Sequence, residues 1–467
     1  MLFHSHEFLF FFLLVFPLHW MVKNARLRHW ILLLASYWFY MAWDARFGAL
    51  MLFITTLDYT IGLALGRPDL SQSARRWLIR FSLASNLGAL GIFKYFNFFQ
   101  GSLESLLGAQ WRHLDIVLPV GISFYTFQSL SYTIDIYRRQ MSPERSFVRF
   151  ALFVAFFPQL IAGPIIRAAD FIPQLQTPKT WRWDLLHQGL VLFLFGLAKK
   201  VMVADNLSTI VDPVFREPDL YSGLGCYFAA VCFAFQIYCD FSGYSDMACG
   251  LALCFGYRLM ENFSMPYATS NPSDFWRCWN ISLSTWLRDY LYVSLGGNRG
   301  TKARTATNLM LTMFLGGLWH GANWTFIWWG IYHGCYLSVY HLLRDRLSRL
   351  SSHAWIGWMG ILVNFHLFLV SWILFRADSL SIANQMLLNI AGLGHGNVIL
   401  FEPRIIQLLL LVGVCHFLGM RYGCETLWKK WFEAVPSPVA GVAYAVAIVV
   451  ILVLAPDTTD PFIYFQF

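Results

Sequence analysis

Charged side chains are scarce in this chain of 467 residues. Asp, Glu, Lys and Arg together make up 13% of it, whereas a soluble domain carries roughly 25% charged residues. This scarcity excludes an ordinary soluble protein. Hydrophobic residues make up 57% of the chain and aromatic residues 18%, and apolar runs of about 20 residues recur along it, as in polytopic helical membrane proteins. We therefore expect an all-α integral membrane protein.

Several functional signatures are missing as well. The sequence contains no zinc, P-loop, dinucleotide or GxSxG pattern. Its nine cysteines lie mainly in apolar segments without metal-ligand spacing, so we expect them to pack as small hydrophobic side chains. The net charge of +8 comes from Lys and Arg in short loops and does not indicate nucleic-acid binding. We expect no bound metal and no permanently bound cofactor.

The hydrophobic segments follow one another with no long polar interruption, which predicts one membrane domain over residues 1–467. The first run, from Phe8 to Val22, lacks a basic n-region and a small-residue cleavage site, so we interpret it as a span. The core motifs lie in 115–345, and the spans within 1–100 and 355–455 are expected to be peripheral. About 11–13 hydrophobic helices are predicted: 7–22, 29–43, 45–66, 77–97, 115–133, 147–166, 185–204, 221–239, 305–319, 324–343, 355–375, 404–420 and 437–455.

The distribution of Lys and Arg predicts the orientation. Positive residues gather in the loops after the first and third spans, near Lys23 and Arg75, and again near Arg344. The residues before Phe8 and the tail DTTDPFIYFQF contain no Lys or Arg. Because cytoplasmic loops carry the excess of positive charge, both termini should face away from the cytoplasm.

Two apolar segments contain Pro and Gly where a plain span would not. They read LPVGISFYTFQSLSY and FFPQLIAGPIIR. Broken backbone at membrane depth is tolerated only where protein or a water-filled cavity satisfies its polar groups. We expect re-entrant or broken helices around a central cavity. No internal repeat is visible, which counts against the two-fold architecture common among transporters.

The segment NPSDFWRCWNISLSTWLRDYLY is predicted to be one helix that starts at Asn271-Pro272. Asn280, Ser284 and Arg288 recur every four residues and would share one face of it. One interpretation is an interfacial amphipathic helix with snorkelling arginines. The other is that this polar stripe faces a cavity, where Asn280 offers its amide to a reacting group.

A short basic turn, GGNRGTKAR, follows that segment and brings Arg299 and Lys302 near Arg288. Clustered cations beside glycine-freed backbone amides suit phosphate groups. A cytoplasmic loop that only obeys the positive-inside rule has the same composition. If the turn is a binding site, an acyl-coenzyme A with its phosphates is the expected ligand.

The segment GGLWHGANW carries the strongest local signal. It places His320 within hydrocarbon-like sequence, where an ionisable side chain is a functional candidate. Burial disfavours the charged imidazole, and a neutral His can take a proton from an attacking hydroxyl or thiol and return it to the leaving group. Asn323 is expected to cap the helix that follows. His333, 13 residues after His320, should not contact it directly and has a supporting or structural role.

Further polar residues occur in QIYCDFSGYSDM, at the predicted end of the span 221–239. Asp240 and Asp246 could shuttle protons there. Alternatively, they could anchor a helix break through Asx-type hydrogen bonds, which is the structural reading.

The sequence resembles the membrane-bound O-acyltransferase family, and within it the alginate O-acetylase branch of bacterial polysaccharide acetylation proteins. The matching motifs run through nearly the whole chain, from ASYWFYMAW through FFPQLIAGPIIR and WNISLSTWLRDYLY to LGGLWHGANWTFIWWGIYHG. The resemblance implies a catalytic pair formed by His320 and Asn280. Asn280 stands where the alginate branch tends to have His, and Asn323 replaces the second His of a WHGAHW-type motif. Alginate, cellulose, another exopolysaccharide and peptidoglycan all remain possible acceptors.

These observations predict an O-acetyltransferase of the bacterial inner membrane, with acetyl-CoA as the expected cytoplasmic donor. His320 would act as general base, and Asn280 would orient the acyl carbonyl or stabilise its oxyanion. The resemblance also implies a periplasmic partner protein with a serine nucleophile, which accepts the acetyl group and passes it to the polysaccharide. The alternative from another class is a polysaccharide exporter without acyl-transfer chemistry. A scaffold that only recruits acetylation proteins is a third reading.

Overall fold

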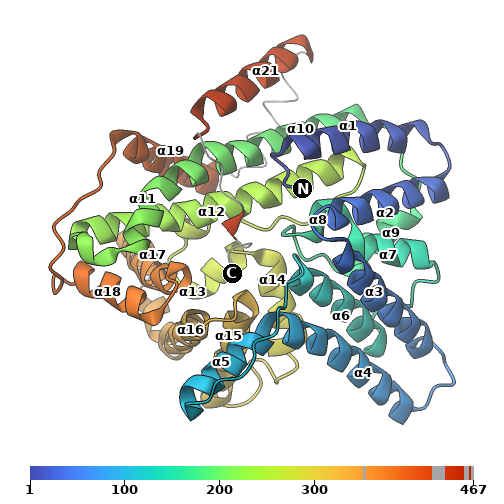
Figure 1. The fold of residues 1–467 in the computed structure, drawn as a ribbon, viewed down its shortest axis with the longest axis horizontal. Coiled ribbons are helices and arrows are strands. Elements are labelled where there is room, and N and C mark those ends of the chain that lie inside the picture. The colour runs from blue at the N-terminus through green and yellow to red at the C-terminus, as the bar shows by residue number, and fades with distance from the viewer. Residues whose placement is uncertain (351–353, 423–436, 457–461, 464–467) are drawn as a thin grey trace. The chain divides into compact units, whose positions relative to one another are not determined.

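In the computed structural model the fold is all-helical, as predicted (Figure 1). The structure describes residues 1–350, 354–422, 437–456 and 462–463. Within these ranges the only β-type pairing is an isolated bridge between Tyr221 and Val398. Most of the tail DTTDPFIYFQF lies outside the described residues.

The chain forms two compact units. Unit 1 consists of Met1–Phe193 and Tyr244–Glu261, and unit 2 consists of Leu194–Gly243 and Asn262–Phe467. Two helices, α10 (Trp183–Ala198) and α12 (Gly223–Cys254), pass from one unit into the other. That the whole chain acts as a single membrane-embedded domain stays a prediction.

Unit 1 holds the helices of the N-terminal part of the chain. They are α1 (His6–Met21), α2 (Ala25–Met41), α3 (Ala45–Leu65), α4 (Gln72–Leu90), the π-helix η1 (Gly91–Tyr95), α5 (Phe96–Leu107), α6 (Ile122–Tyr137), α7 (Phe147–Ala155), α8 (Phe157–Leu160) and α9 (Ala168–Gln176).

Helices α3, α4 and α6 pack around one buried carboxylate. Asp58 accepts hydrogen bonds from Ser82 Oγ (2.7 Å) and Asn86 Nδ2 (2.8 Å), so this acidic group is satisfied within the protein.

The two segments predicted to be broken are broken, and they touch one another. Helix α6 begins at Ile122 rather than at residue 115, directly after Gly121, whose φ is +73°. A Cβ atom on Gly121 would lie 2.6 Å from the carbonyl oxygen of Leu160, so only glycine fits this approach. The second segment divides into α7 and α8 at Phe156. That these segments line a central cavity stays a prediction.

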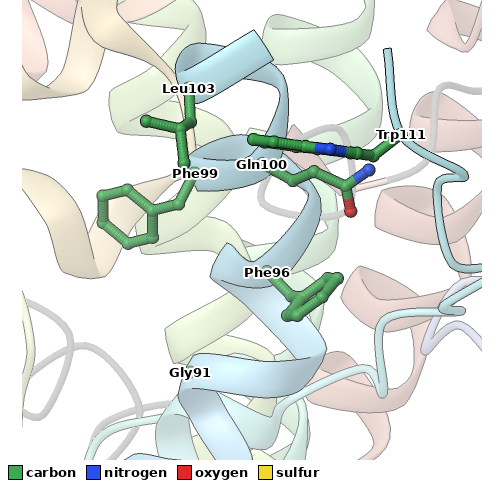
Figure 2. A pocket seen from close by; sticks show the side chains of 6 residues that line it. All are labelled: Gly91, Phe96, Phe99, Gln100, Leu103 and Trp111. Carbon is green, nitrogen blue, oxygen red and sulfur yellow. The ribbon is translucent and has the colours of Figure 1, made fainter. Parts of the chain in front are cut away.

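The span predicted at 77–97 is the first part of a longer element, because α4 continues through η1 into α5. No residue of α5 is buried. Its side chains Phe96, Phe99 and Leu103, together with Trp111, line a hollow of about 540 Å³, in which the Gln100 side chain lies beside the Trp111 indole (Figure 2). Exposed apolar side chains of this kind are suited to contact with lipid tails.

Unit 2 contains the helices that carry the segments WNISLSTWLRDYLY and GGLWHGANW. Besides α10 and α12, its elements are the π-helix η2 (Lys199–Ala204), α11 (Asp205–Arg216), the 3-10 turns η3 (Pro218–Leu220) and η4 (Pro266–Ala268), α13 (Pro272–Cys278), α14 (Ile281–Trp286), the π-helix η5 (Leu287–Tyr292), α15 (Lys302–His320), α16 (Trp324–Leu350), α17 (Ala354–Arg376), α18 (Leu380–Ile390), α19 (Pro403–Tyr422) and α21 (Ser437–Leu454).

Four described helices are individually long and apolar enough to cross a membrane: α3, α12, α17 and α19. Helices α1 and α21 are apolar but shorter. The main difference from the prediction is α12, which has 32 residues and does not end near residue 239. Asp240 therefore lies inside a continuous helix, and the interpretation that it anchors a helix break is wrong.

Helices α15 and α16 form a tight antiparallel hairpin (Figure 1). Glycines let the two backbones touch: Gly317 of α15 lies against Gly330 of α16, and Gly334 lies against Met310. Close approach through small residues is a common way for membrane helices to associate. The hairpin sets the register of α15 against α16, and so the position of His320.

We predict that Gly330→Ala destabilises the protein by about 1–3 kcal/mol, because a methyl group there would lie 2.5 Å from the Met313 carbonyl oxygen. Gly357→Ala in α17 is the matched control, since nothing lies within 4 Å of its Cβ position. The control should be neutral or slightly stabilising. Thermal unfolding of both variants in detergent measures the difference. Equal midpoints would show that the Gly330 contact does not limit packing.

Candidate active site

Asn280 lies at a break in the segment that was predicted to be one helix. Helix α13 ends at Cys278 and α14 begins at Ile281, while Asn280 between them has a φ of +41°. Asparagine tolerates this left-handed conformation better than most residues. The prediction of a continuous helix over 271–292 is therefore wrong. The apolar side chains before and after the turn at Asn280 are buried alike. Their periodicity therefore could not reveal the turn.

The cap of α14 comes from elsewhere in the chain. Asn262 accepts the Ile281 N–H at its backbone oxygen (2.9 Å) and the Ser282 N–H at Oδ1 (3.0 Å). Asn280 occupies the N-cap position, but its side chain makes no capping hydrogen bond. It is 1% exposed, and neither its Nδ2 nor its Oδ1 has a hydrogen-bond partner in the part of the chain that the structure describes. The backbone holds the amide in place, and the polar atoms of its side chain are not used by the described residues.

Ser284 and Arg288, the other two members of the predicted polar stripe, interact with residues near them in the sequence. Ser284 donates a hydrogen bond to the carbonyl oxygen of Trp279 (3.0 Å), which supports the break. Arg288 lies in the π-helix η5, is exposed, and pairs with Asp289 at 2.7 Å. Because the helix is interrupted, these residues and Asn280 do not form one helical face.

His320 is the last residue of α15 and is 5% exposed. Its ring lies among aromatic rings from α15, α16 and α17. The centroid distances are 5.1 Å to Trp319, 4.9 Å to Trp329 and 5.2 Å to Phe375. The imidazole is therefore enclosed by apolar rings at the end of a helix that the glycine contacts hold in place.

An aromatic bridge connects the surroundings of His320 and Asn280. Phe375, which contacts His320, lies 5.7 Å from Trp372, and Trp372 lies 4.8 Å from Trp279, the residue before Asn280. On the other side, Leu287 of η5 lies against Gly316, one turn before His320. Both candidate residues belong to one aromatic core within unit 2.

Several polar atoms of this core are unsatisfied. The indole nitrogens of Trp276 and Trp329 have no hydrogen-bond partner among the described residues, and neither do the two ring nitrogens of His333. Leaving a buried polar group unpaired costs about 1–3 kcal/mol, so each such group calls for an explanation, such as a catalytic role or a bound water. The tryptophans were missed from the sequence, where their spacing looks like an ordinary apolar stripe.

Asn323 performs the structural role predicted for it. Its Oδ1 accepts the Thr325 N–H at 3.1 Å and its Nδ2 donates to the Asp378 carbonyl oxygen at 3.0 Å. The side chain thus caps α16 and fixes the segment after α17. His333 does not contact His320 directly, because the Trp329 ring lies between them, 4.6 Å from the His333 ring.

Of the basic residues predicted to bind phosphate, Arg288 lies in η5, Arg299 in the segment between η5 and α15, and Lys302 at the first position of α15. Arg299 is exposed, and Lys302 pairs with Asp345 at 3.2 Å, with side chains 60% and 74% exposed. Gly296, Gly297 and Gly300 in the same segment have positive φ angles. A role in binding coenzyme A stays a prediction.

Asp240 belongs to a buried ion cluster that the sequence did not reveal. Lys200 of η2 lies 2.7 Å from Asp240 Oδ1 and 2.8 Å from Asp205 Oδ1, and all three side chains are buried. The backbone N–H of Ile463 donates to Asp240 Oδ2 at 2.8 Å. The cluster joins η2, α11 and α12. A lysine in an apolar segment was the available signal, but its partner 40 residues later could not be identified.

We predict that Lys200→Met destabilises the protein by about 3–5 kcal/mol, because it leaves two carboxylates without their shared cation in a buried site. Lys302→Met removes an exposed ion pair and should change stability by only about 0–1 kcal/mol. Thermal unfolding and the yield of monodisperse protein in detergent measure both effects. Similar behaviour of the two variants would contradict a stabilising role for the cluster.

Comparison with known proteins places these residues in a family context. A sequence model of the membrane-bound O-acyltransferase family matches residues 138–377, a range that contains Asn280, His320 and His333. The chain is 45% identical to the probable alginate O-acetylase AlgI of Azotobacter vinelandii, over 83% of this chain and 77% of that protein. It is 44% identical to the corresponding Pseudomonas aeruginosa protein, over 83% and 74%. It is also 35% identical to the peptidoglycan O-acetyltransferase of Helicobacter pylori, over 84% and 80%.

Proposed function

Because the chain belongs to the membrane-bound O-acyltransferase family, and is thus an integral membrane acyltransferase, we propose that it transfers acetyl groups toward a polysaccharide of the cell envelope. The observation that carries this proposal is the aromatic core of unit 2. It holds the buried imidazole of His320 and the unpartnered amide of Asn280, the two groups that acyl transfer needs. The relatives named for alginate and for peptidoglycan acetylation support the acetyl group and the polymer class.

In the proposed reaction His320 acts as general base. It removes the proton from an attacking hydroxyl group as the oxygen bonds to the acetyl carbonyl carbon. The Asn280 Nδ2–H groups donate to the developing oxyanion, an interaction worth roughly 3 kcal/mol in known oxyanion holes. When the tetrahedral intermediate collapses, the carbon–sulfur bond breaks and His320 returns the proton to the thiolate. The free amide of Asn280 fits this role, since Asn262 has taken over the capping of α14.

The donor in this proposal is acetyl-CoA, delivered from the cytoplasm. Its phosphates would contact the exposed side chains of Arg288 in η5, Arg299, and Lys302 at the start of α15. The proposed location is the bacterial inner membrane with both termini in the periplasm. A periplasmic protein with a serine nucleophile would accept the acetyl group and pass it to the polymer. Membership of an acyltransferase family favours this chemistry over a polysaccharide exporter or a passive scaffold.

Alginate and peptidoglycan are the first candidate acceptors, because relatives named for their acetylation have 45% and 35% identity to this chain. Acetylated cellulose is a third candidate. The acetyl content of each polymer in a deletion strain would identify the acceptor, because only the true acceptor should lose its acetyl groups.

We predict that His320→Gln lowers kcat for acetyl transfer by about 10²–10⁴-fold, because an amide of similar size cannot accept the proton at neutral pH. The measurement is release of free CoA from acetyl-CoA by purified protein, together with polymer acetylation in membranes. His395→Ala, which alters an exposed histidine in the segment after α18, is the control and should remain active. Full activity of His320→Gln would refute the assignment of the base.

We predict that Asn280→Gly lowers kcat by about 10²–10³-fold. Glycine accepts the φ of +41° at this position, so the backbone is preserved while the amide is removed. Asn280→His introduces the residue typical of the alginate branch and should retain activity within about tenfold, because its ring can also donate a hydrogen bond. If both variants lose activity equally, the position serves packing rather than oxyanion stabilisation.

A further inference from the structure

His333 of α16 is fully buried, and neither of its ring nitrogens has a hydrogen-bond partner in the described part of the chain. Aromatic rings surround it instead. The centroid distances are 5.1 Å to Trp276, 4.6 Å to Trp329, 5.5 Å to Tyr332 and 5.1 Å to Phe368. A phenylalanine would fill this aromatic box without leaving polar atoms unsatisfied.

No structural role explains an imidazole at this position. A histidine that only joins helices normally donates or accepts at one nitrogen at least. An N–H group directed at a neighbouring ring face gains only a weak interaction, and the lone pair of the second nitrogen then still lacks a donor. The side chain therefore costs stability in the unliganded protein, which is expected where a residue serves a ligand.

The position of His333 along the hairpin relates it to the proposed reaction. Helix α15 runs from the basic segment at Lys302 to His320, and α16 returns to Asp345, which pairs with Lys302. Gly334 lies against Met310 of α15, so His333 sits between the level of His320 and the basic end of the hairpin. Its side chain reaches toward the start of α16, as helical side chains do, and both His333 and His320 contact the Trp329 ring.

We propose that His333 binds the acyl donor on the leaving-group side of the thioester. This inference rests on the proposed function, in which acetyl-CoA extends from the basic segment to His320. A neutral imidazole offers one donor and one acceptor, which complement the carbonyl oxygen and the N–H of an amide. The amide-containing arm of coenzyme A supplies such groups. The indole N–H groups of Trp276 and Trp329, which also lack partners among the described residues, offer further donors to the same ligand.

The test is His333→Phe in the full-length protein, with acetyl-CoA as the probe. We expect KM for acetyl-CoA to rise at least tenfold, while kcat falls less and the melting temperature without donor stays equal or rises. His333→Gln, which restores a donor and an acceptor, should recover part of the affinity. Tyr336→Phe on the same helix is the matched control. It removes the hydrogen bond to Asn364 (2.7 Å), so it should lower the melting temperature and leave KM within twofold.

The outcomes separate this inference from the proposed function. If the wild-type protein does not release CoA from acetyl-CoA, the proposed donor fails, and the inference fails with it. An active wild type with an unchanged KM in His333→Phe overturns the inference alone. A variant with a lower melting temperature and lost activity, not recovered in His333→Gln, would show that the imidazole serves packing and would also overturn it.

Discussion

The main constraint on unit 2 is that it must tolerate buried polar groups without hydrogen-bond partners among the described residues, in a core that is otherwise aromatic and apolar. Asn280 and His333 are buried without hydrogen-bond partners among the described residues, and the ring of His320 lies 4.9 Å from that of Trp329. In a low-dielectric core such groups can bind a polar ligand strongly, because water does not compete with it. The cost in stability and the proposed catalytic role would then have one physical origin.

The surrounding helices supply the packing and capping contacts that hold this core together. Glycine contacts between α15 and α16 bring the two backbones together, and the Asn262 cap secures the break before α14. The Lys200 cluster joins α12 to η2 and α11. Together these contacts fix the elements that carry the two candidate catalytic residues within unit 2.

Much of this arrangement could be predicted from the sequence, because it depends on local patterns. The helix hairpin around His320, the cap at Asn323 and the breaks near Gly121 and Phe156 all follow from neighbouring residues. The break at Asn280 could not be predicted, since the residue that makes it possible, Asn262, lies 18 positions earlier and acts only after folding. The partner of Lys200 in α12 is also distant in the sequence and could not be identified. The predicted span 221–239 ended too early, because α12 continues to Cys254.

The cluster of Lys200, Asp205 and Asp240 also has a consequence for biogenesis. Lys200 and Asp205 lie five residues apart, so they emerge from the ribosome together and can pair before α12 is synthesised. Asp240 follows 35 residues after Asp205, and a carboxylate alone in a lipid bilayer is costly. The segment that carries Asp240 is therefore best suited to enter the bilayer beside the segment that already carries Lys200.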